Sequence, residues 1–570
     1  MEKIDRRNFI TNAASELIGS EKGSYEFEYI DPANKKLPDN LRKTSKGIAA
    51  YTGSFGETQL IHLLRRTIFG VNQSDIDFFK NKSLTEVVDY LLSLPNNPPS
   101  PPLNYYSYNT NFPDAEVAAG QTWVNAAVNP NLEGLRVSSL KAWWLGLLTN
   151  PQRNIREKMT LFWHNHFSTE STVVQDSRYL YKHHALLRAN CLGNFKELVK
   201  QVTIDPAMLV YLNGEDNTKT APDENYGREL QELFTVGKDL ANHYTEDDVK
   251  AAAKVLTGWR NNRLGISSYF DSTRHDTTNK QFSSFYNNTV ILGRSGSNAG
   301  MDELNDLINM IFNQEEVSKY ICRKIYRFFV YYLIDSSVEQ NVIIPLATLL
   351  RNNNYDIKPV IETLLKSEHF FDELNFGCMI KSPVDHLIGL SRNFSLIFPD
   401  GTNVQQTYGH WLYAQQVMAA IGLNLGDPPN VAGWPAYYED PQFYELWINS
   451  DSLPKRNAIC DSLIYTGFSR FGFNLKINSI AFAESFQNPE DPNILMASIL
   501  KILYAMNLSS NHINLIKTGF LLSGQNADHY WTDAWLAYKQ NPSVSNKAAV
   551  ESRLQGLLKY LLGLPEYQLS

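Results

Sequence analysis

The sequence has few cysteines, and they do not form a recognisable pair. Its 570 residues include only four, which are far apart and contain no CxxC pair: Cys191, Cys322, Cys378 and Cys460. Zinc ribbons need paired cysteines, and small disulfide-stabilised folds need a dense cysteine framework. Both classes are excluded, and the four residues are expected to be buried free thiols.

Long apolar runs and long basic runs are missing as well. No apolar run reaches the roughly 18 residues that a membrane span needs, so no span is expected. The formal net charge is −8, from 60 acidic and 52 basic residues, and no run of Lys or Arg occurs. Nucleic-acid binding requires a basic patch, so a nucleic-acid partner is not expected.

Common catalytic motifs are also absent. The chain has no GxSxG, no P-loop glycine array, no HExxH and no dinucleotide fingerprint in the expected context. These motifs carry the chemistry of serine hydrolases, nucleoside triphosphatases, zincins and Rossmann enzymes. Those four classes are therefore set aside.

Apolar residues at helical spacing dominate the remainder of the chain. Hydrophobic residues make up 43% and charged residues 20%, as in an ordinary globular protein. The pattern predicts an all-α, multi-lobed helical bundle with long irregular connections and a small loop or β insertion. The expected parts are an N-terminal arm (1–46), N-terminal helices with a proline-rich connection (47–114), a central helical core (115–260), the insertion (261–300), a second helical lobe with a Pro-Pro-Asn-Val turn (301–450) and C-terminal helices (451–570).

Local signals predict several element ends. Gly70 is expected to close a first helix, and Asn72 to cap the next one. Thr245 and Asp248 form a capping-box variant at the start of another helix. The proline-rich stretch 94–102 cannot be helical, so it is expected to begin a long surface connection that runs to Pro113.

Two segments carry the candidate chemistry. Glu229 and Glu232 are three residues apart on a predicted helix, so they share a face and could bind a metal or share a proton. His164 and His166 are two apart, which places them about 200° apart on a helix. They converge on one ion only if the helix breaks there. The alternatives are a solvated acidic face and buried histidines bonded to backbone groups.

Imidazole together with carboxylate suits zinc, iron or manganese. The sharper hypothesis is a divalent metal held by His164 or His166 and by Glu229 or Glu232, as helical bundles can build such centres. His275 and Asp276, on the insertion, are a third contributor or a base with its orienting partner. The arginines Arg228, Arg65 and Arg66 could bind a carboxylate, phosphate or sulfate, or else serve as buried ion-pair partners of the glutamates.

The N-terminus contains a possible export signal. Asp5–Ile10 resembles a twin-arginine signal, although the residues that follow are too polar for a regular apolar region. The alternative is a short basic N-terminal helix.

Many ordered segments of the chain are similar to those of one family. They are 62–66 with Phe69 and Gly70, 162–167, 205–208 with 211–212, 224–230, 232–237, 244–249, 256–259, 275–276, 381–384 and 428–435. Over most of its length the chain resembles a large bacterial family catalogued as domain of unknown function 1800. It departs from the family pattern in its weak leader and in Asp223, where Asn is usual. The resemblance implies no established activity; it implies export behind a twin-arginine leader and a sulfatase-like partner protein.

Two functions follow as expectations. The leading one is a metal-dependent enzyme, hydrolytic or oxidative, that acts on a polymer or polar small molecule, with the His and Glu residues as ligands or general base. It would work in the periplasm or outside the cell if the leader functions, and in the cytoplasm otherwise. The alternative is a non-catalytic binding or assembly factor for a co-expressed secreted partner, in which the same residues form a buried polar network.

Overall fold

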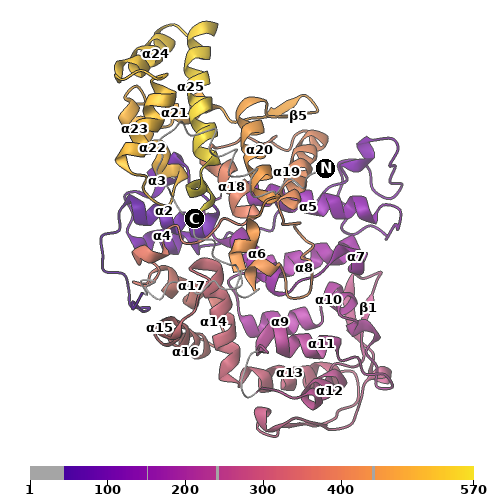
Figure 1. Cartoon of the computed structure of the whole chain (residues 1–570). Coiled ribbons are helices and arrows are strands. Elements are labelled where there is room, and N and C mark those ends of the chain that lie inside the picture. Colours follow the sequence, from indigo (N-terminus) through magenta and orange to yellow (C-terminus); the bar gives the residue numbers. More distant parts are fainter. Residues whose placement is uncertain (1–43, 151, 239–242, 439–442) are drawn as a thin grey trace, which may run out of the picture. The chain divides into compact units, whose positions relative to one another are not determined.

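Helices carry most of the regular structure of the chain. The computed structural model describes residues 44–150, 152–238, 243–438 and 443–570 (Figure 1). The all-α, multi-lobed fold predicted from the sequence is confirmed. By its internal contacts the chain from Thr44 to Ser570 forms one unit, and the boundaries predicted within it stay predictions. The twin-arginine-like segment 5–10 lies outside the described residues.

The first helices begin where the capping signals indicate, but the first one ends differently. They are α2 (Glu57–Ile68), α3 (Gln73–Phe79) and α4 (Leu84–Leu91). Asn72 caps α3 as predicted, because its side chain accepts a hydrogen bond from the backbone N–H of Asp75. The residue that ends α2 in a left-handed conformation is Phe69, with φ 67°, so the prediction that Gly70 closes the helix is wrong.

Gly70 instead allows two backbones to meet. A Cβ atom at Gly70 would lie 2.9 Å from the Cα of Gly389, which belongs to α18 (Pro383–Asn393). A Cβ at Gly389 would in turn lie 2.8 Å from the carbonyl oxygen of Phe69. Both positions therefore require glycine, because α18 and the end of α2 are in direct backbone contact.

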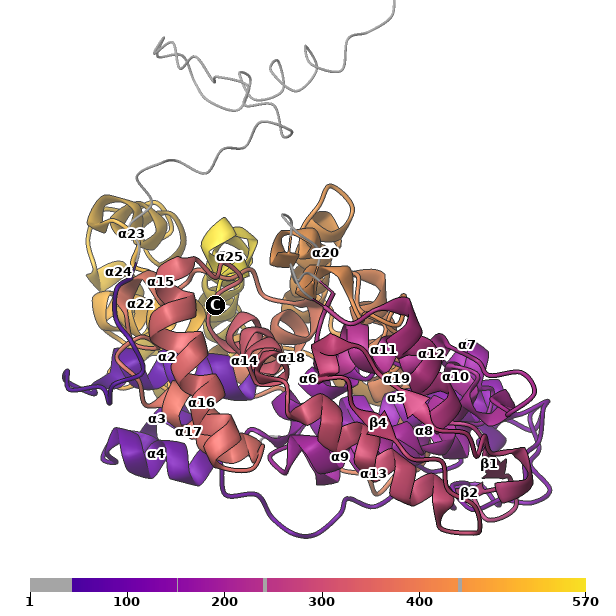
Figure 2. The same ribbon diagram turned by 90° about the horizontal axis from the view of Figure 1, so that it is seen from below.

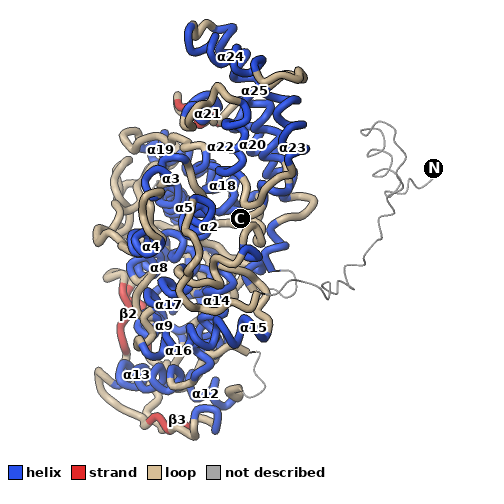
Figure 3. Tube along the Cα trace, turned by 90° about the vertical axis from the view of Figure 1, so that its left-hand side faces the viewer, coloured by secondary structure: helices blue, strands red, loops and turns tan. Residues whose placement is uncertain are grey.

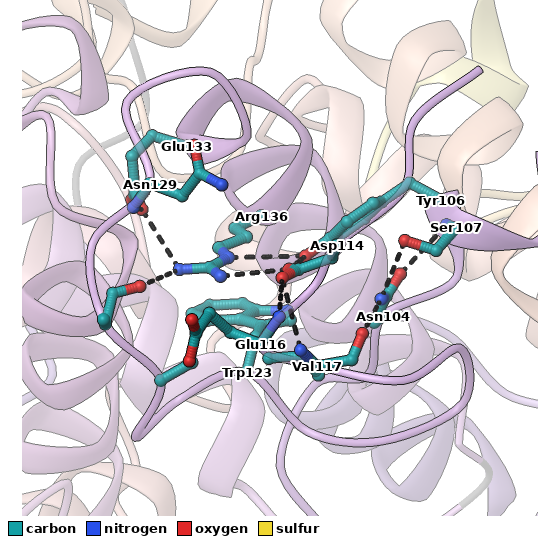
Figure 4. Close-up of polar contacts among 12 residues, drawn as sticks. Asn104, Tyr106, Ser107, Asp114, Glu116, Val117, Trp123, Asn129, Glu133 and Arg136 are labelled. Carbon is teal, nitrogen blue, oxygen red and sulfur yellow. Dashed lines mark hydrogen bonds and ion pairs between the residues drawn. The ribbon is translucent and has the colours of Figure 1, made fainter. Parts of the chain in front are cut away.

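The connection between α4 and α5 is longer than predicted. Helices were expected from residue 115, but α5 (Glu133–Thr149) begins at Glu133, after the short 3₁₀ turn η2 (Tyr106–Tyr108). Part of the connection is buried rather than superficial, since Trp123 is completely buried. The fully buried Arg136 of α5 holds it in place through Asp114, at 3.0 Å, and the main-chain carbonyl of Ala127, at 2.7 Å (Figure 4).

The central region is a set of short helices, of which α8 packs along α6. After α5 come α6 (Arg156–His166), α7 (Ser171–Val174), α8 (Ser177–Ala189), α9 (Phe195–Thr203), α10 (Pro206–Tyr211), α11 (Asn225–Glu229) and α12 (Glu246–Val255). The side chain of Trp163, in α6, is fully buried, and its indole N–H donates to the carbonyl of Cys191 over 2.9 Å. The capping box of Thr245 and Asp248 at the start of α12 is confirmed.

The predicted insertion contains two small antiparallel hairpins. Strand β1 (Trp259–Asn262) pairs with β2 (Ser267–Phe270), and β3 (Lys280–Gln281) pairs with β4 (Val290–Ile291). A third hairpin, β5 (Phe468–Arg470) with β6 (Phe473–Leu475), lies in the C-terminal part. Figure 3 shows how little strand there is beside the helices.

The remaining helices form the second half of the fold. They are α13 (Ala299–Phe312), α14 (Glu315–Phe329), α15 (Ser336–Val338), α16 (Ile344–Asn352), α17 (Ile357–Leu365), α18, α19 (Val404–Ala420), α20 (Ser452–Tyr465), α21 (Ser479–Glu484), α22 (Pro492–Leu503), α23 (Ser510–Ile516), α24 (His529–Gln540) and α25 (Val544–Gly563). Helix α19 packs along α5, and α20 along α25. In Figures 1 and 2, α6, α14 and α18 lie near the middle of the described chain. Of the described helices, none combines the length and apolar character that crossing a bilayer requires.

Candidate functional site

The two histidines of α6 face different surroundings. The ring of His164 lies against Trp144 and Trp434, with centroids 5.0 and 6.1 Å away. His166 points elsewhere: its Nε2 lies 3.1 Å from the carbonyl oxygen of Phe234 and its Nδ1 lies 3.3 Å from Lys324 Nζ. Because α6 continues as a regular helix through both residues, they diverge as the 200° rule predicts and do not meet at one point.

Burial keeps both imidazoles neutral. It lowers the pKa of His164 to about 3, with a smaller contribution from His183. Burial also lowers the pKa of His166 well below its ordinary value, and the charge of Lys324 adds to this effect. At neutral pH, neither ring therefore carries a positive charge.

The two glutamates are close to each other, but the helix changes type between them. Glu229 is the last residue of α11, and Glu232 lies in η4 (Leu230–Thr235), a π-helical turn. Burial, followed by the charge of Glu232, raises the pKa of Glu229 to about 7. Glu232 is partly exposed and lies 3.5 Å from Lys238. Glu229 can therefore exchange a proton near neutral pH.

Arg228 is not the partner of these glutamates. Its guanidinium donates to both carboxylate oxygens of Glu246, over 2.7 and 2.6 Å, and also to Glu224, over 3.2 Å. The interpretation of Arg228, Arg65 and Arg66 as buried ion-pair partners of Glu229 and Glu232 is wrong. Arg228 is instead a half-exposed link between α11 and α12.

Thr257 and Lys280 connect His275 and Asp276 in one network, but among the described residues no direct contact joins the two side chains. The Nε2 of His275 lies 3.1 Å from the buried carboxylate of Glu303, in α13, while its Nδ1 faces the carbonyl of Thr257 at 2.9 Å. Asp276 instead accepts from the backbone N–H of Thr278. Glu303 therefore orients His275, and the predicted pairing with Asp276 is not seen.

The four predicted metal ligands are thus not gathered into one set. His164 and His166 lie on different sides of α6, and each glutamate sits apart from them on α11 or η4. Among the residues that the structure describes, no group of three or more His, Cys, Asp or Glu side chains is placed to hold a metal ion. In this arrangement the four residues do not form a metal centre.

A pocket of a different character lies where four distant segments meet. Arg65 and Arg66 come from α2, Lys158 and His166 from α6, Lys324 and Arg327 from α14, and Asp385 from α18. Half of the remaining wall is aromatic, namely Phe162, Phe328, Tyr332, Tyr437, Tyr438, Tyr444 and Trp447, and the other half consists of Asn165, Met379, Ile380, Ser382, Ala432, Ala436 and Ser570. Five basic side chains thus face one acidic side chain among the described residues of the lining. The pocket is strongly cationic although the whole chain is acidic.

The two arginines of α2 have no acidic partner in the described part of the chain. Arg65 donates to the carbonyls of Lys501 and Ile502, each over 2.9 Å. Arg66 donates to the carbonyl of Asn375 over 3.0 Å, and within the described chain its Nε has no hydrogen-bond partner. Neither forms an ion pair with a described carboxylate. Burial lowers the pKa of Arg65 to about 9, so its guanidinium remains charged at neutral pH.

The opposite wall is fixed by a charged contact. Ser382 caps α18 by accepting from the N–H of Asp385, and its hydroxyl donates to the Asp385 carboxylate over 2.7 Å. Asp385 also forms an ion pair with the nearly buried ammonium of Lys158. The only acidic side chain of the described lining is thus already paired.

The turn rich in proline and glycine completes the pocket. Ala432 and Tyr437 of this turn line it. The backbone N–H of Trp434 donates to the side-chain carbonyl of Asn165, in α6, over 2.9 Å. Gly433 has φ 97°, and a Cβ atom there would lie 2.3 Å from the same oxygen. Glycine is therefore required where the turn presses onto α6.

Sequence reasoning identified some of this pocket but not its centre. Arg65 and Arg66 were singled out as possible anion ligands, and His166 as a metal ligand. Lys158, Lys324 and Asp385 were missed. In the sequence, each of the three is a charged residue among the apolar residues of a predicted helix. That pattern does not show which residues of other helices will face the charged side chain.

Comparisons with known proteins identify the family but no characterised relative. Curated proteins and solved structures give no match. One family model, described as "Protein of unknown function (DUF1800)", matches residues 62–569. This span contains the segments that build the pocket and covers most of the sequence. The chain is therefore a member of the DUF1800 family.

Proposed function

We propose that the protein captures a small anion, or the anionic group of a larger molecule, in the pocket between α2, α6, α14 and α18. The observation that carries the proposal is the imbalance of charge. Five basic side chains line the pocket, and its one acidic side chain among the described residues is paired with Lys158. Phosphate, sulfate and carboxylate are the groups that arginine recognises best, because its planar fork can donate two parallel hydrogen bonds.

Burial makes this pocket a favourable place for an anion. Arg66 is buried and faces carbonyl and sulfur atoms rather than a carboxylate. A buried charge without a counter-ion is costly, so an arriving anion removes a penalty that the empty pocket carries. The cost of desolvating the arginines has already been met during folding, and only the ligand still has to shed water.

The size of the pocket limits the part of the ligand that enters. It offers about 40 Å³ for the centres of water-sized molecules, which is room for a few waters or one small anionic group. The aromatic wall next to it supports a flat or apolar body attached to that group. A phosphorylated, sulfated or carboxylated small molecule, or the end of a polymer that carries such a group, fits this description.

Calorimetric titration with inorganic phosphate and inorganic sulfate tests the proposal. Binding is expected for the unaltered protein, and Arg66→Gln is expected to weaken it at least tenfold, a loss of roughly 1.4 kcal/mol. Arg228→Gln is the matched control, since it removes an arginine outside the pocket and is expected to change the affinity less than twofold. Arg327→Gln is a second pocket variant in case Arg66→Gln does not fold. Equal affinity in the unaltered protein and both pocket variants would refute the proposal, as would a failure of both anions to bind.

A second candidate keeps the metal-dependent hydrolytic or oxidative enzyme expected from the sequence. The observation in its favour is Glu229, whose pKa of about 7 suits a general base at neutral pH. Protein purified without chelators should then contain zinc, iron or manganese in stoichiometric amount, and Glu229→Gln should reduce the metal content. Metal-free protein that takes up none of the three ions on addition would remove this candidate.

Ligand capture is common to an enzyme and to the non-catalytic binding or assembly factor that is the alternative. Turnover of the bound molecule separates the two. Export by the N-terminal segment and a sulfatase-like partner protein remain predictions from the family resemblance. Detection of the protein in the periplasmic fraction would support the first of them.

A further inference from the structure

One lysine in the pocket has no acidic partner among the described residues. Lys324 lies on α14, and its Nζ is 3.3 Å from His166 Nδ1 and 3.5 Å from the carbonyl oxygen of Leu233. The ring of Tyr320 lies 4.9 Å away. Within the described chain Lys324 forms no ion pair. In contrast, Lys158 in the same pocket is paired with Asp385.

The contacts of His166 define how it meets this lysine. A carbonyl oxygen can only accept a hydrogen bond, so the His166 nitrogen that faces Phe234 must carry the ring proton. The other nitrogen, Nδ1, is then an acceptor, and it faces the Lys324 amine. A proton acceptor therefore lies within hydrogen-bond reach of the amine nitrogen.

We propose that Lys324 is a nucleophilic amine that forms a Schiff base with a carbonyl compound carrying an anionic group. This inference rests on the proposed function, because the other cations of the pocket hold the anionic group. The ligand class is a small oxo acid or an aldehyde that bears a carboxylate or phosphate. A nucleophilic lysine of this kind is activated by desolvation and by a neighbouring cation. For Lys324, the pocket provides the desolvation and Arg327 is the neighbouring cation.

The chemical step is balanced without an oxidant or a reductant. The lone pair of the neutral amine attacks the carbonyl carbon, a carbon–nitrogen bond forms, and the carbonyl oxygen becomes a hydroxyl group. His166 Nδ1 accepts one proton from the nitrogen and returns it to the oxygen, which completes the hydroxyl group. The second proton of the nitrogen then reaches the hydroxyl by the same route, the carbon–oxygen bond breaks as water leaves, and a neutral carbon–nitrogen double bond remains.

The surroundings of Lys324 favour the neutral amine. Burial, and then the charge of Arg327 on the same helix, lowers the pKa of Lys324 to about 7. The other elements packed against it contribute the neutral imidazole of His166, from α6, and the carbonyl of Leu233, from η4. Since neither group is negatively charged, these two contacts do not restore the ammonium form. An ordinary lysine is almost entirely protonated at pH 7.

Reductive trapping tests the inference on the whole protein. Glyoxylate, a small aldehyde with a carboxylate, is added with sodium cyanoborohydride, and the labelled lysines are located by mass spectrometry of peptides. Lys324 is expected to be the main labelled residue at pH 7, and inorganic phosphate is expected to reduce its labelling at least tenfold. Labelling of Lys324 should rise with a midpoint near pH 7, while that of exposed lysines should rise only toward their ordinary pKa of about 10.4.

Two variants on α14 serve as a matched pair. Lys324→Arg keeps a cation but cannot form the imine, so labelling at the pocket is expected to disappear. Lys319→Arg, whose lysine lies near Glu315, is expected to leave labelling of Lys324 unchanged. Label spread evenly over surface lysines would overturn the inference.

The two proposals can fail separately. Phosphate binding without preferential labelling of Lys324 overturns the Schiff-base inference and leaves anion capture intact. Failure of both phosphate binding and labelling overturns both. Labelling of Lys324 that phosphate does not reduce also counts against the inference, because the amine would then react without the anion-binding residues.

Discussion

Replacing Glu303 with glutamine is expected to lower the free energy of unfolding by about 3–5 kcal/mol. The Glu303 carboxylate is fully buried, and one of its oxygens accepts from Lys280 Nζ over 2.6 Å. The other lies 3.1 Å from His275 and accepts from the N–H of Arg294 over 2.7 Å. Glutamine has nearly the same shape but no charge, so the buried ammonium of Lys280 loses its nearest carboxylate partner and keeps the more distant one, Asp276, at 3.9 Å. Urea denaturation of the two proteins at pH 7 measures the difference.

The effect should depend on pH in a defined direction. Burial raises the pKa of Glu303, but the contacts from His275, Lys280 and the backbone N–H of Arg294 outweigh it and leave the pKa below its ordinary value. The carboxylate therefore contributes its full stabilisation above the unfolded pKa and loses it as the pH falls through the lower, folded pKa. The gap between protein and variant should shrink in acid.

An exposed glutamate provides the control for this substitution. Glu484 pairs with Lys539 on the surface, so Glu484→Gln is expected to change stability by less than about 1 kcal/mol. A loss at Glu303 as small as that at Glu484 would show that the Lys280 contact is not a buried ion pair in solution.

Replacing Gly433 with alanine is expected to displace the turn that lines the pocket, with a loss of about 3 kcal/mol in stability. Two costs combine at this position. Its φ of 97° is unfavourable for any residue with a side chain, and the new Cβ would lie 2.3 Å from the side-chain oxygen of Asn165 and 2.5 Å from its main-chain oxygen. Because Ala432 and Tyr437 move with the turn, binding of inorganic phosphate is expected to weaken at least tenfold. Thermal unfolding and calorimetric titration measure the two effects.

A substitution at a second glycine distinguishes the cost of backbone strain from the cost of the steric clash at Gly433. Gly401 has a similar φ of 91°, but a Cβ atom there would meet nothing within 4 Å. Gly401→Ala is therefore expected to cost only about 1–2 kcal/mol and to leave phosphate binding unchanged. If both variants lose the same stability and bind phosphate equally well, the turn at Gly433 is not part of the pocket.

The helical fold was predictable because its signals are local. The caps at Asn72 and Thr245 depend on residues three positions apart, and the structure confirms both. The end of α2 was not predictable. Gly70 is required by its backbone contact with Gly389, more than 300 residues away in the sequence, and not by the end of its own helix. Likewise, the late start of α5 depends on Arg136 and on a connection that folds back onto it.

The candidate site also has features that the local sequence predicts and features that depend on tertiary packing. The opposite facing of His164 and His166 follows from helix geometry alone and was predicted. The raised pKa of Glu229 fits the predicted carboxyl pair, although the π-turn between Glu229 and Glu232 was not foreseen. The Lys324–His166 contact joins residues 158 positions apart, and only packing of α14 against α6 and η4 could reveal it.

The contact between Gly70 and Gly389 determines how rigidly the pocket is held. The helix that carries Arg65 and Arg66 ends where its backbone touches α18, the helix that carries Asp385. Two main chains in contact cannot approach further, and separating them would open a gap in a close-packed interior. The spacing between these walls is thus set before any ligand arrives. For the proposed anion, we therefore expect little conformational entropy to be lost on association, and we expect an anion that is one atom too wide to be rejected.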